Sequence, residues 1–526
     1  MIDDSSRAGG LLAAFTGYRA ARAAAARHAC HLLGIGRAAA AAHVTAETGV
    51  VTDANAAVAA AAVRPPTGAR GAKLAAIGEW LRRHARVVQA LQWGIVAAYA
   101  FFVIVPAFLP LPADDAHWFN SLALFSQWLF WGVWWPFVIA SMFVVGRAWC
   151  GLFCPEGTLT EAASRFGLGL AVPRWLKWGG WPFVAFALTT VFGQLVSVYQ
   201  YPAATLLVLG GSTLAAIVVG FVYGRGKRVW CRHLCPVNGV FAVLSRVAPV
   251  HFRVDTHAWS ANASRIPAHP VNCAPLVRIR RMTGPSECHM CGRCSGLHAA
   301  IGLSARSPSR EVMALDESAA RPWDAILIVF GMIGLALGAF EWSATGAFVA
   351  LRAAAIDFFV DHGPAWILAD NAPWWILTNY PEAHDVFTWL DGGLILVWIL
   401  GTAVLVGGWV SFWLLVAARG LRNAQPASLL AVALALSYTL IPLAGAGLFV
   451  GLSALPATLA HGEGFRIAWL PYPRIILLVA AGMWSLYLAR RRLETRAAGP
   501  KRAGALAAMA LAIGGVLAAW APFVLR

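Results

Sequence analysis

Apolar residues run in stretches of about 20 positions along most of the chain from residue 88 onward, with polar segments between them. A stretch of this length crosses the roughly 30 Å hydrocarbon core of a bilayer as an α-helix. The pattern therefore predicts an all-α polytopic membrane protein with about nine transmembrane helices. We expect these helices near residues 88–112, 119–145, 178–200, 203–224, 322–346, 386–416, 427–453, 472–489 and 503–525.

The charges in the connecting segments indicate the orientation of these helices. Arg and Lys gather in alternate connections, and residues 225–321 hold fourteen of them against five Asp and Glu. This asymmetry follows the positive-inside rule, so we expect the N-terminal region and the long loop 237–321 in the cytoplasm. The connections 347–385 and 454–471 are then outside, and an odd number of spans also puts the C-terminus outside.

The composition agrees with a membrane protein and excludes several other classes. The chain is 59% hydrophobic and only 12% charged, with a mean hydropathy of +0.65. Its net charge of +17 is not accompanied by a nucleic-acid-binding motif, so we assign the excess to topology and to anionic membrane lipid. We found no nucleophile–base pattern, phosphate loop or dinucleotide motif. The chain is therefore expected to be an electron-transfer component rather than an independent enzyme.

Two copies of one cysteine motif follow the second and fourth predicted spans. Residues 147–155 and 228–236 both have the form R-x-W-C-x-x-x-C-P, and Ser-Arg follows each copy at the same offset. Paired thiolates at short spacing with Pro after the second Cys are typical ligands of iron–sulfur clusters. Zinc knuckles do not need the Pro, and buried structural cysteines would not explain a repeat. Each repeat is expected to be a helical hairpin that brings two thiols to the cytoplasmic face.

The long loop carries a third cysteine motif, C-x₂-C-x₂-C, formed by Cys288, Cys291 and Cys294. This is the first part of the bacterial ferredoxin run, in which three thiolates from one turn bind a [4Fe–4S] cluster and a fourth Cys completes the set. Cys273 upstream is our preferred fourth ligand, and His298 is the alternative because it has the spacing of the missing Cys. A zinc knuckle is the other interpretation of this loop on its own.

Eight of the nine cysteines lie between residues 150 and 294, and all eight fall on the predicted cytoplasmic side, where ligands are more common than disulfides. Cys30 has no partner and no assigned role. We expect two [4Fe–4S] clusters, although crossed pairing of all eight thiols, as in two-cluster ferredoxins, stays open. Arg147 and Arg228 are expected to offset the negative charge of the thiolates. The predicted ligands are Cys150, Cys154, Cys231, Cys235, Cys273, Cys288, Cys291 and Cys294.

Repeated hairpins ending in C-x₃-C-P, followed by a ferredoxin-like loop, resemble the membrane polyferredoxins across roughly residues 88–310. These include NapH, the C-terminal part of NosR, CcoG and the FtrD-type component of bacterial iron uptake. The resemblance implies [4Fe–4S] clusters and electron transfer at the bacterial inner (plasma) membrane. It implies as partners a quinone, an iron permease with a cupredoxin, or a periplasmic reductase system. The chain departs from NapH and NosR in its incomplete ferredoxin run and in its five additional spans, and these spans favour the iron-uptake type.

These observations predict four parts and leave an alternative function open. The parts are a low-complexity basic cytoplasmic N-terminal region (1–87), two repeated hairpins (88–236), a cytoplasmic iron–sulfur loop (237–321) and a five-helix C-terminal membrane domain (322–526). In the alternative function, an assembly or transport-associated component, the clusters are structural or regulatory. Ionisable residues at outer helix ends are candidates for binding iron, a quinone head group or haem, or else face water: Glu341, His384, Asp385, Asp391 and His461.

Overall fold

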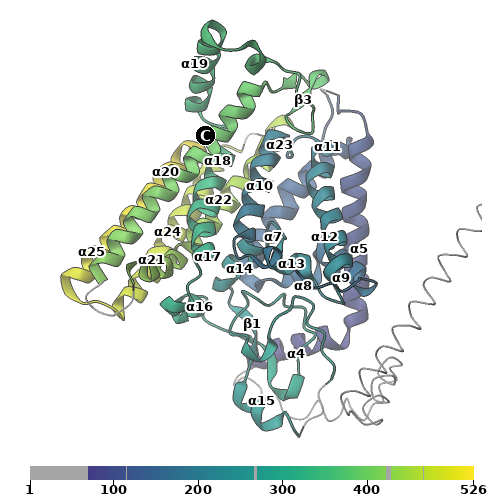
Figure 1. Ribbon diagram of the computed structural model, residues 1–526, viewed down its shortest axis with the longest axis vertical. Coiled ribbons are helices and arrows are strands. Elements are labelled where there is room, and N and C mark those ends of the chain that lie inside the picture. The colour runs from purple at the N-terminus through teal and green to yellow at the C-terminus, as the bar shows by residue number, and fades with distance from the viewer. Residues whose placement is uncertain (1–68, 114, 266–268, 422–427, 466, 526) are drawn as a thin grey trace, which may run out of the picture. The chain divides into compact units, whose positions relative to one another are not determined.

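The computed structural model describes residues 69–526 apart from positions 114, 266–268, 422–427, 466 and 526. The predicted N-terminal tail up to residue 68, with Cys30, lies outside the described residues. The rest is a bundle of long helices with a small polar region at one end (Figure 1). Within it, eight helices are long and apolar enough to cross a membrane, so the predicted all-α membrane fold is confirmed.

The N-terminal half contains the two repeated hairpins. Its three spans end at residues 108, 145 and 223, a shorter apolar helix ends at residue 195, and the thiol motifs follow the spans that end at residues 145 and 223. Its helices are α4 (Ala69–Arg83), α5 (Ala85–Ile104), α6 (Leu122–Gln127), α7 (Trp135–Val145), α8 (Ala148–Leu152), α9 (Pro155–Arg165), α10 (Trp181–Leu195), α11 (Pro202–Thr205), α12 (Gly211–Tyr223), α13 (Val229–His233) and α14 (Asn238–Leu244).

The third expected span differs from its prediction. In place of a span over 178–200, α10 has 15 residues and is about 22 Å long, which is shorter than the roughly 30 Å core of a bilayer. The helix ends because the chain turns sharply at Ser197, whose φ is +48°. The residues after α10 form turns, and Val198 and Tyr199 line an internal cavity. Apolar residues in this stretch therefore line the interior of the bundle and do not only face lipid.

The C-terminal half contains the five further spans that the sequence predicts. Two of these segments, residues 322–341 and 429–462, are the most buried of the spans, with 72% and 78% of an 18-residue apolar window buried, so they lie at the centre of the bundle. The helices of this half are α17 (Pro322–Ile326), α18 (Ala336–Glu341), α19 (Gly346–His362), α20 (Trp389–Leu421), α21 (Leu429–Ser437), α22 (Ile441–Leu452), α23 (Ala454–Gly462), α24 (Pro471–Glu494) and α25 (Gly499–Val524).

Three spans are wound as π-helix over part of their length, at Trp128–Trp134, Leu206–Gly210 and Leu327–Leu335. Such segments are rare and are often found at functional sites. The first two contribute side chains to the same internal cavity, among them Trp131, Trp134 and Leu209. Two of the three π-helical segments therefore lie beside this internal cavity.

The long polar loop folds around two short antiparallel strands, β1 (Val250–Val254) and β2 (Ile301–Ala305), with Val250 opposite Ala305. Phe252, Leu297 and Ile301 form its small core together with other apolar side chains. Helices α15 (Thr256–Asn262) and α16 (Arg310–Ala314) flank this pair, and α4 packs against β2. The strand pair brings the two ends of the cysteine-rich segment together.

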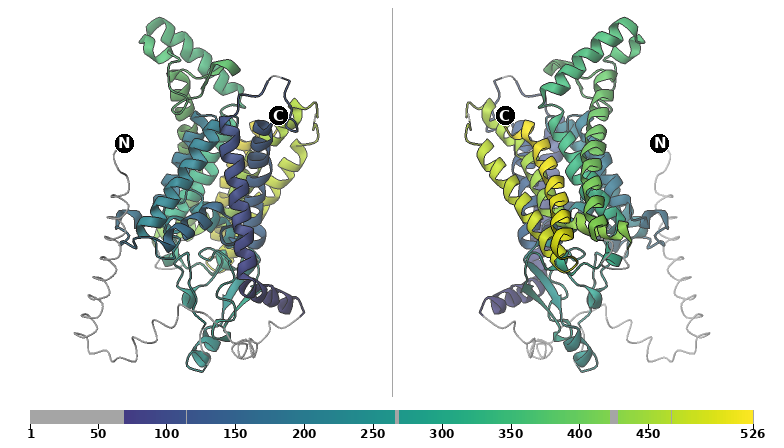
Figure 2. Two further views of the ribbon diagram at one scale, coloured as in Figure 1. Left: turned by 90° about the vertical axis from the view of Figure 1, so that its right-hand side faces the viewer. Right: turned by 90° about the vertical axis from the view of Figure 1, so that its left-hand side faces the viewer.

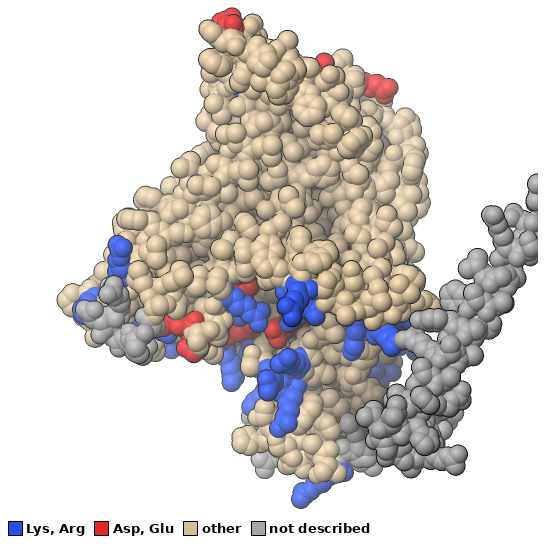
Figure 3. Space-filling model, in the orientation of Figure 1, with Lys and Arg blue, Asp and Glu red and all other residues tan. Residues whose placement is uncertain are grey.

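The two ends of the bundle differ in charge. Figure 2 shows α19 and the end of α25 at the end of the bundle opposite the β1–β2 loop. On the face in Figure 3, Lys and Arg gather around the loop and the adjoining helix ends, while the opposite end shows mainly Asp and Glu. A second strand pair, β3 (Asn379–Tyr380) with β4 (Asp385–Val386), lies in the connection before α20.

Candidate metal centre

The C-x₃-C-P motif has a local structural explanation. Cys150 lies in the one-turn helix α8, and Cys154 is the N-cap of α9, where its Sγ accepts from the backbone N–H of Gly157 at 3.4 Å. Pro155 follows at the first helical position, where Pro lacks only an N–H that would have no helical partner. In this first copy one thiol thus lies in a short helical turn and the other caps the next helix.

The second copy repeats the first part of this arrangement, since Cys231 lies in the one-turn helix α13, whereas the next helix, α14, begins at Asn238 with Val237 as its N-cap. The backbone N–H groups of Cys154 and Cys235 donate to the carbonyls of Trp149 and Trp230, at 2.9 and 3.0 Å. All four thiol residues of the two copies line one cavity of about 210 Å³. We refer to this group, Cys150, Cys154, Cys231 and Cys235, as the hairpin thiol set.

The other four cysteines meet in the loop. Cys273, Cys288, Cys291 and Cys294, the loop thiol set, line a smaller cavity of about 20 Å³ whose other walls are mainly apolar. Met290 and Gly292 take φ values of +55° and +76°, and these left-handed turns lie between the cysteines of the motif. The N–H of Met290 points at the Sγ of Cys288, 3.3 Å away. Backbone N–H groups near sulfur are typical of sites for anionic thiolates.

The donor chemistry of both sets suits iron–sulfur clusters. The loop cavity has four thiols and no carboxylate in its lining, and soft sulfur ligands select clusters or zinc over hard cations. Among the described residues, no three Cys, His, Asp or Glu side chains converge as the ligands of a single metal ion would. The two thiol sets therefore match an iron–sulfur cluster in the type and number of their ligands, with four thiols around each cavity.

Burial governs the titration of these thiols. It raises the pKa of Cys231 to about 12 and that of Cys288 to about 12, and the neighbouring thiols add to the effect. Thiolates are the form that binds metal, so the proton must leave when metal enters. Metal binding to either thiol set would therefore release protons.

Cys273 and His298, the two candidates for the fourth loop ligand, lie in different surroundings. Cys273 is part of the loop thiol set. His298 lines neither thiol cavity, and its ring lies against Trp259 with centroids 4.7 Å apart. Its backbone carbonyl accepts from Asn262 at 3.1 Å. The geometry favours Cys273.

Each of the two repeats begins with an arginine, and both arginines form hydrogen bonds to the loop. Arg147 is 3% exposed, and its Nη1 donates to the carbonyl of Ser286 at 2.9 Å. Arg228 is 2% exposed; its Nη1 donates to the carbonyl of Cys150 at 2.6 Å, and its backbone N–H donates to Ala274. The two arginines, which we expected to offset thiolate charge, also tie the repeats to the loop.

A buried carboxylate adds a third tie. Glu161 of α9 pairs with Arg228 at 2.8 Å and with Arg293 of the loop at 2.7 Å. Burial alone would raise the pKa of Glu161, but the two guanidinium groups hold it below its ordinary value. An unpaired charge here would be costly, so the three side chains act as one unit.

Gly151 provides the closest contact between the first repeat and the loop. A Cβ at this position would overlap the carbonyl oxygen of His289 and lie 2.9 Å from the N of Cys291. The second repeat has Arg232 at the equivalent position. The difference is explained by the loop, because its backbone lies directly on Gly151.

The candidate residues of the C-terminal half do not gather in one site. Glu341 and Asp391 are buried, and Asp391 pairs with Arg352 at 2.5 Å. Asp385 accepts from Tyr201 at 2.8 Å and lines a cavity of about 350 Å³ near the end away from the thiols. His384 and His461 are exposed and line none of the cavities described here.

Sequence reasoning missed three residues of the site. Glu156 and Glu161 lie within the first repeat where the second has Val237 and Ala242, and this difference was a usable signal. The third is His289, which lies between two cysteines of the loop motif and is buried, at 3% exposed.

Comparison with known proteins agrees with this geometry. A family described as "4Fe-4S binding domain" matches twice, at residues 127–177 and 206–255, and these ranges contain the hairpin thiol set. The loop thiol set lies beyond both ranges. No solved structure matches the chain.

Three curated relatives are similar over part of the chain. An electron transport protein of Escherichia coli K12, YccM, is 25% identical over 39% of this chain and 64% of its own length. The ferredoxin-type protein MauN of Methylorubrum extorquens is 29% identical over 22% and 43%. The ferredoxin-type protein NapH of Haemophilus influenzae is 25% identical over 28% and 58%. The chain thus matches less than two thirds of each relative, and its two 4Fe–4S binding repeats are similar to those of NapH-like membrane polyferredoxins.

Proposed function

We propose that the chain binds two [4Fe–4S] clusters, one at the hairpin thiol set and one at the loop thiol set, and passes electrons to a redox partner at the bacterial inner membrane. A [4Fe–4S] cluster supplies a centre that gains and loses one electron. The observation that carries the proposal is the grouping of eight thiols into two sets of four, each around its own cavity. Crossed pairing is less favoured, because each of these two cavities is lined by the thiols of one set.

Anaerobically purified protein is expected to contain iron and acid-labile sulfide close to two [4Fe–4S] clusters per chain. Iron, sulfide and zinc analysis on the same sample measures this. Stoichiometric zinc with negligible iron would refute the cluster proposal and support the knuckle alternative.

We also propose that both clusters lie on the cytoplasmic side. Lys and Arg gather at the loop end of the bundle, and such residues are retained in the cytoplasm during insertion. A reporter fused at Ser260 is expected to behave as cytoplasmic and one at Asp370 as periplasmic. Both positions are exposed, so the fusions should not disturb the core. Periplasmic activity at Ser260 would reverse the orientation.

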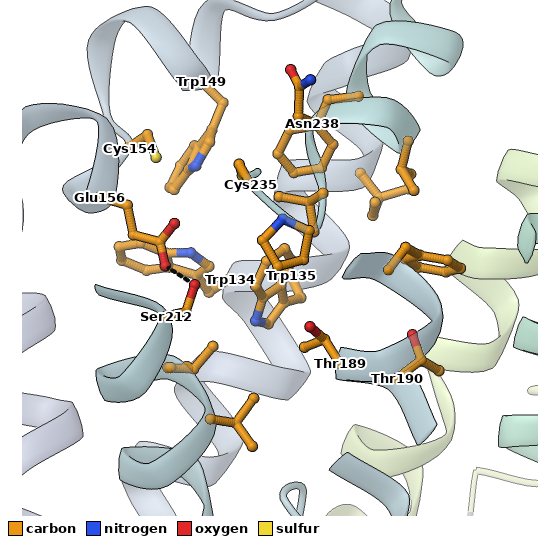
Figure 4. A pocket seen from close by; sticks show the side chains of 18 of the residues that line it. Trp134, Trp135, Trp149, Cys154, Glu156, Thr189, Thr190, Ser212, Cys235 and Asn238 are labelled. Carbon is orange, nitrogen blue, oxygen red and sulfur yellow. Dashed lines mark hydrogen bonds between the residues drawn. The ribbon is translucent and has the colours of Figure 1, made fainter. Parts of the chain in front are cut away.

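The proposed electron donor is a membrane quinol, and the support is the cavity at the hairpin thiol set (Figure 4). This cavity extends among Trp134, Trp135 and Tyr199, which gives it the flat aromatic walls that suit a quinone ring. A few polar groups line it as well. Glu156 accepts from Ser212 at 2.6 Å, and Thr189 faces the same space. The indole N–H of Trp135 has no partner among the described residues.

Oxidation of a quinol releases two protons and two electrons, and each cluster takes up one electron. A short-chain quinol is expected to bleach the cluster absorbance of the wild type, and Thr189→Leu should slow this by about tenfold because it fills the cavity. Dithionite reduction is the control, since it should be equal in both proteins. If quinol leaves the wild-type clusters oxidised, the donor is a cytoplasmic protein.

The acceptor is proposed to be a partner protein, either a periplasmic reductase system or an iron permease with a cupredoxin. The support for the second is the membrane domain from residue 322 onward, which extends beyond the two matched 4Fe–4S repeats. Copurification after crosslinking in the native membrane distinguishes the two.

A further inference from the structure

His289 occupies the junction between the two thiol sets. Of the residues in the described part of the chain, it alone lines both thiol cavities. It follows Cys288 directly in the sequence, so its backbone belongs to the loop thiol set. Its carbonyl lies on Gly151, which is next to Cys150 of the hairpin thiol set. His289 is therefore covalently bonded to a residue of the loop thiol set and in contact with the neighbour of a residue of the hairpin thiol set.

The hydrogen bonds of His289 fix which ring nitrogen carries the proton. The Nη2 of Arg147 lies 3.0 Å from the Nε2 of His289. A guanidinium has only donors, so Nε2 must be the acceptor and the proton of the neutral ring must lie on Nδ1. The assignment rests on this contact and not on the pKa of the ring.

Two N–H donors at this junction then have no acceptor. The Nδ1 of His289 and the Nε of Arg147 are buried and have no hydrogen-bond partner among the described residues. Buried donors are nearly always paired in folded proteins, so an orphaned pair indicates a group that accepts hydrogen bonds here. Both residues line the cavity of the hairpin thiol set, where cluster sulfur would be an anionic acceptor.

We propose that His289 is the positioning residue that connects the two clusters, with its Nδ1–H donating to sulfur of the cluster at the hairpin thiol set. This rests on the proposed function, because it needs both clusters. The step it serves is the movement of one electron: one cluster is oxidised, the other is reduced, and no proton or bond changes place. The support is that His289 is buried and lines both thiol cavities.

A hydrogen bond to sulfur stabilises the more negative, reduced form of a cluster, so it raises the reduction potential. His289→Ala removes the donor and is expected to lower the potential of one cluster while iron and sulfide stay at the wild-type level. Because the reduced form of that cluster loses a hydrogen bond to a charged group, electron transfer into it from the other cluster should also slow by about tenfold. His289→Gln keeps a side-chain N–H and is expected to restore part of both effects.

The measurements are a redox titration followed by electron paramagnetic resonance and a flash-reduction experiment on the purified, fully loaded protein. His257→Ala, on the exposed face of α15, is the matched control and should behave as wild type. Unchanged potentials and exchange rates in His289→Ala, with both clusters present, would overturn the inference and leave the proposed function intact. Loss of a cluster in both His289 variants would also overturn it, since His289 would then be a ligand or a packing residue. Absence of two clusters in the wild type would refute the proposed function itself.

Discussion

Cys273→Ser is expected to lose one of the two clusters or to convert it to a three-iron form, while His298→Ala keeps both. The reason is the position of the two side chains, because Cys273 lines the loop cavity with three other thiols and His298 packs on Trp259 instead. A serine hydroxyl is a poor substitute for a soft thiolate. Electron paramagnetic resonance of the two reduced variants, with iron analysis, measures the difference.

Ligation by His298 in place of Cys273 would give a clearly different result. If His298 were the ligand, His298→Ala would lose the cluster, and the wild-type potential would be unusually high because a neutral imidazole replaces an anionic thiolate. A wild-type signal in Cys273→Ser would exclude that residue as a ligand. The two variants therefore serve as controls for each other.

The helices and the thiol motifs could be predicted because both are local patterns. The segments of α5, α12 and α20 are long apolar runs, and run length alone decides whether a helix can span a bilayer. The thiol motif is likewise local, since the first copy consists of one short turn, one capping thiol and one Pro. The end of α10 was mispredicted, because apolar residues that face an internal cavity resemble those that face lipid.

The packing of the loop on the repeats could not be predicted, because its contacts join residues far apart in the sequence. Arg147 and His289 are 142 positions apart, and Arg293 and Glu161 are 132 apart. The strands β1 and β2 are each five residues long, and nothing in their own composition selects their pairing. Sequence motifs therefore indicated the candidate ligands, while the relation between the two thiol sets needed the fold.

Gly151→Ala is expected to release the loop from the first repeat, with loss or oxygen sensitivity of the loop cluster and a weaker effect on the hairpin cluster. In most helices this exchange is favourable by up to about 1 kcal/mol. Here the added methyl group would overlap the carbonyl of His289, which belongs to the backbone and cannot rotate away. Forced overpacking of this kind costs about 1–3 kcal/mol, which exceeds the gain in helix propensity.

The displaced segment carries Cys288 and Cys291, so a shift of the backbone changes the spacing of the loop thiols first. Iron content, electron paramagnetic resonance and the thermal midpoint of the purified protein measure the effect. Gly94→Ala is the matched control, because a Cβ at Gly94 meets no atom within 4 Å and the residue lies within α5. It should leave both clusters intact and keep or raise the stability. If Gly151→Ala also keeps both clusters with wild-type spectra, the loop does not rest on α8, and the junction at His289 would have to be abandoned as well, since it depends on the same contact.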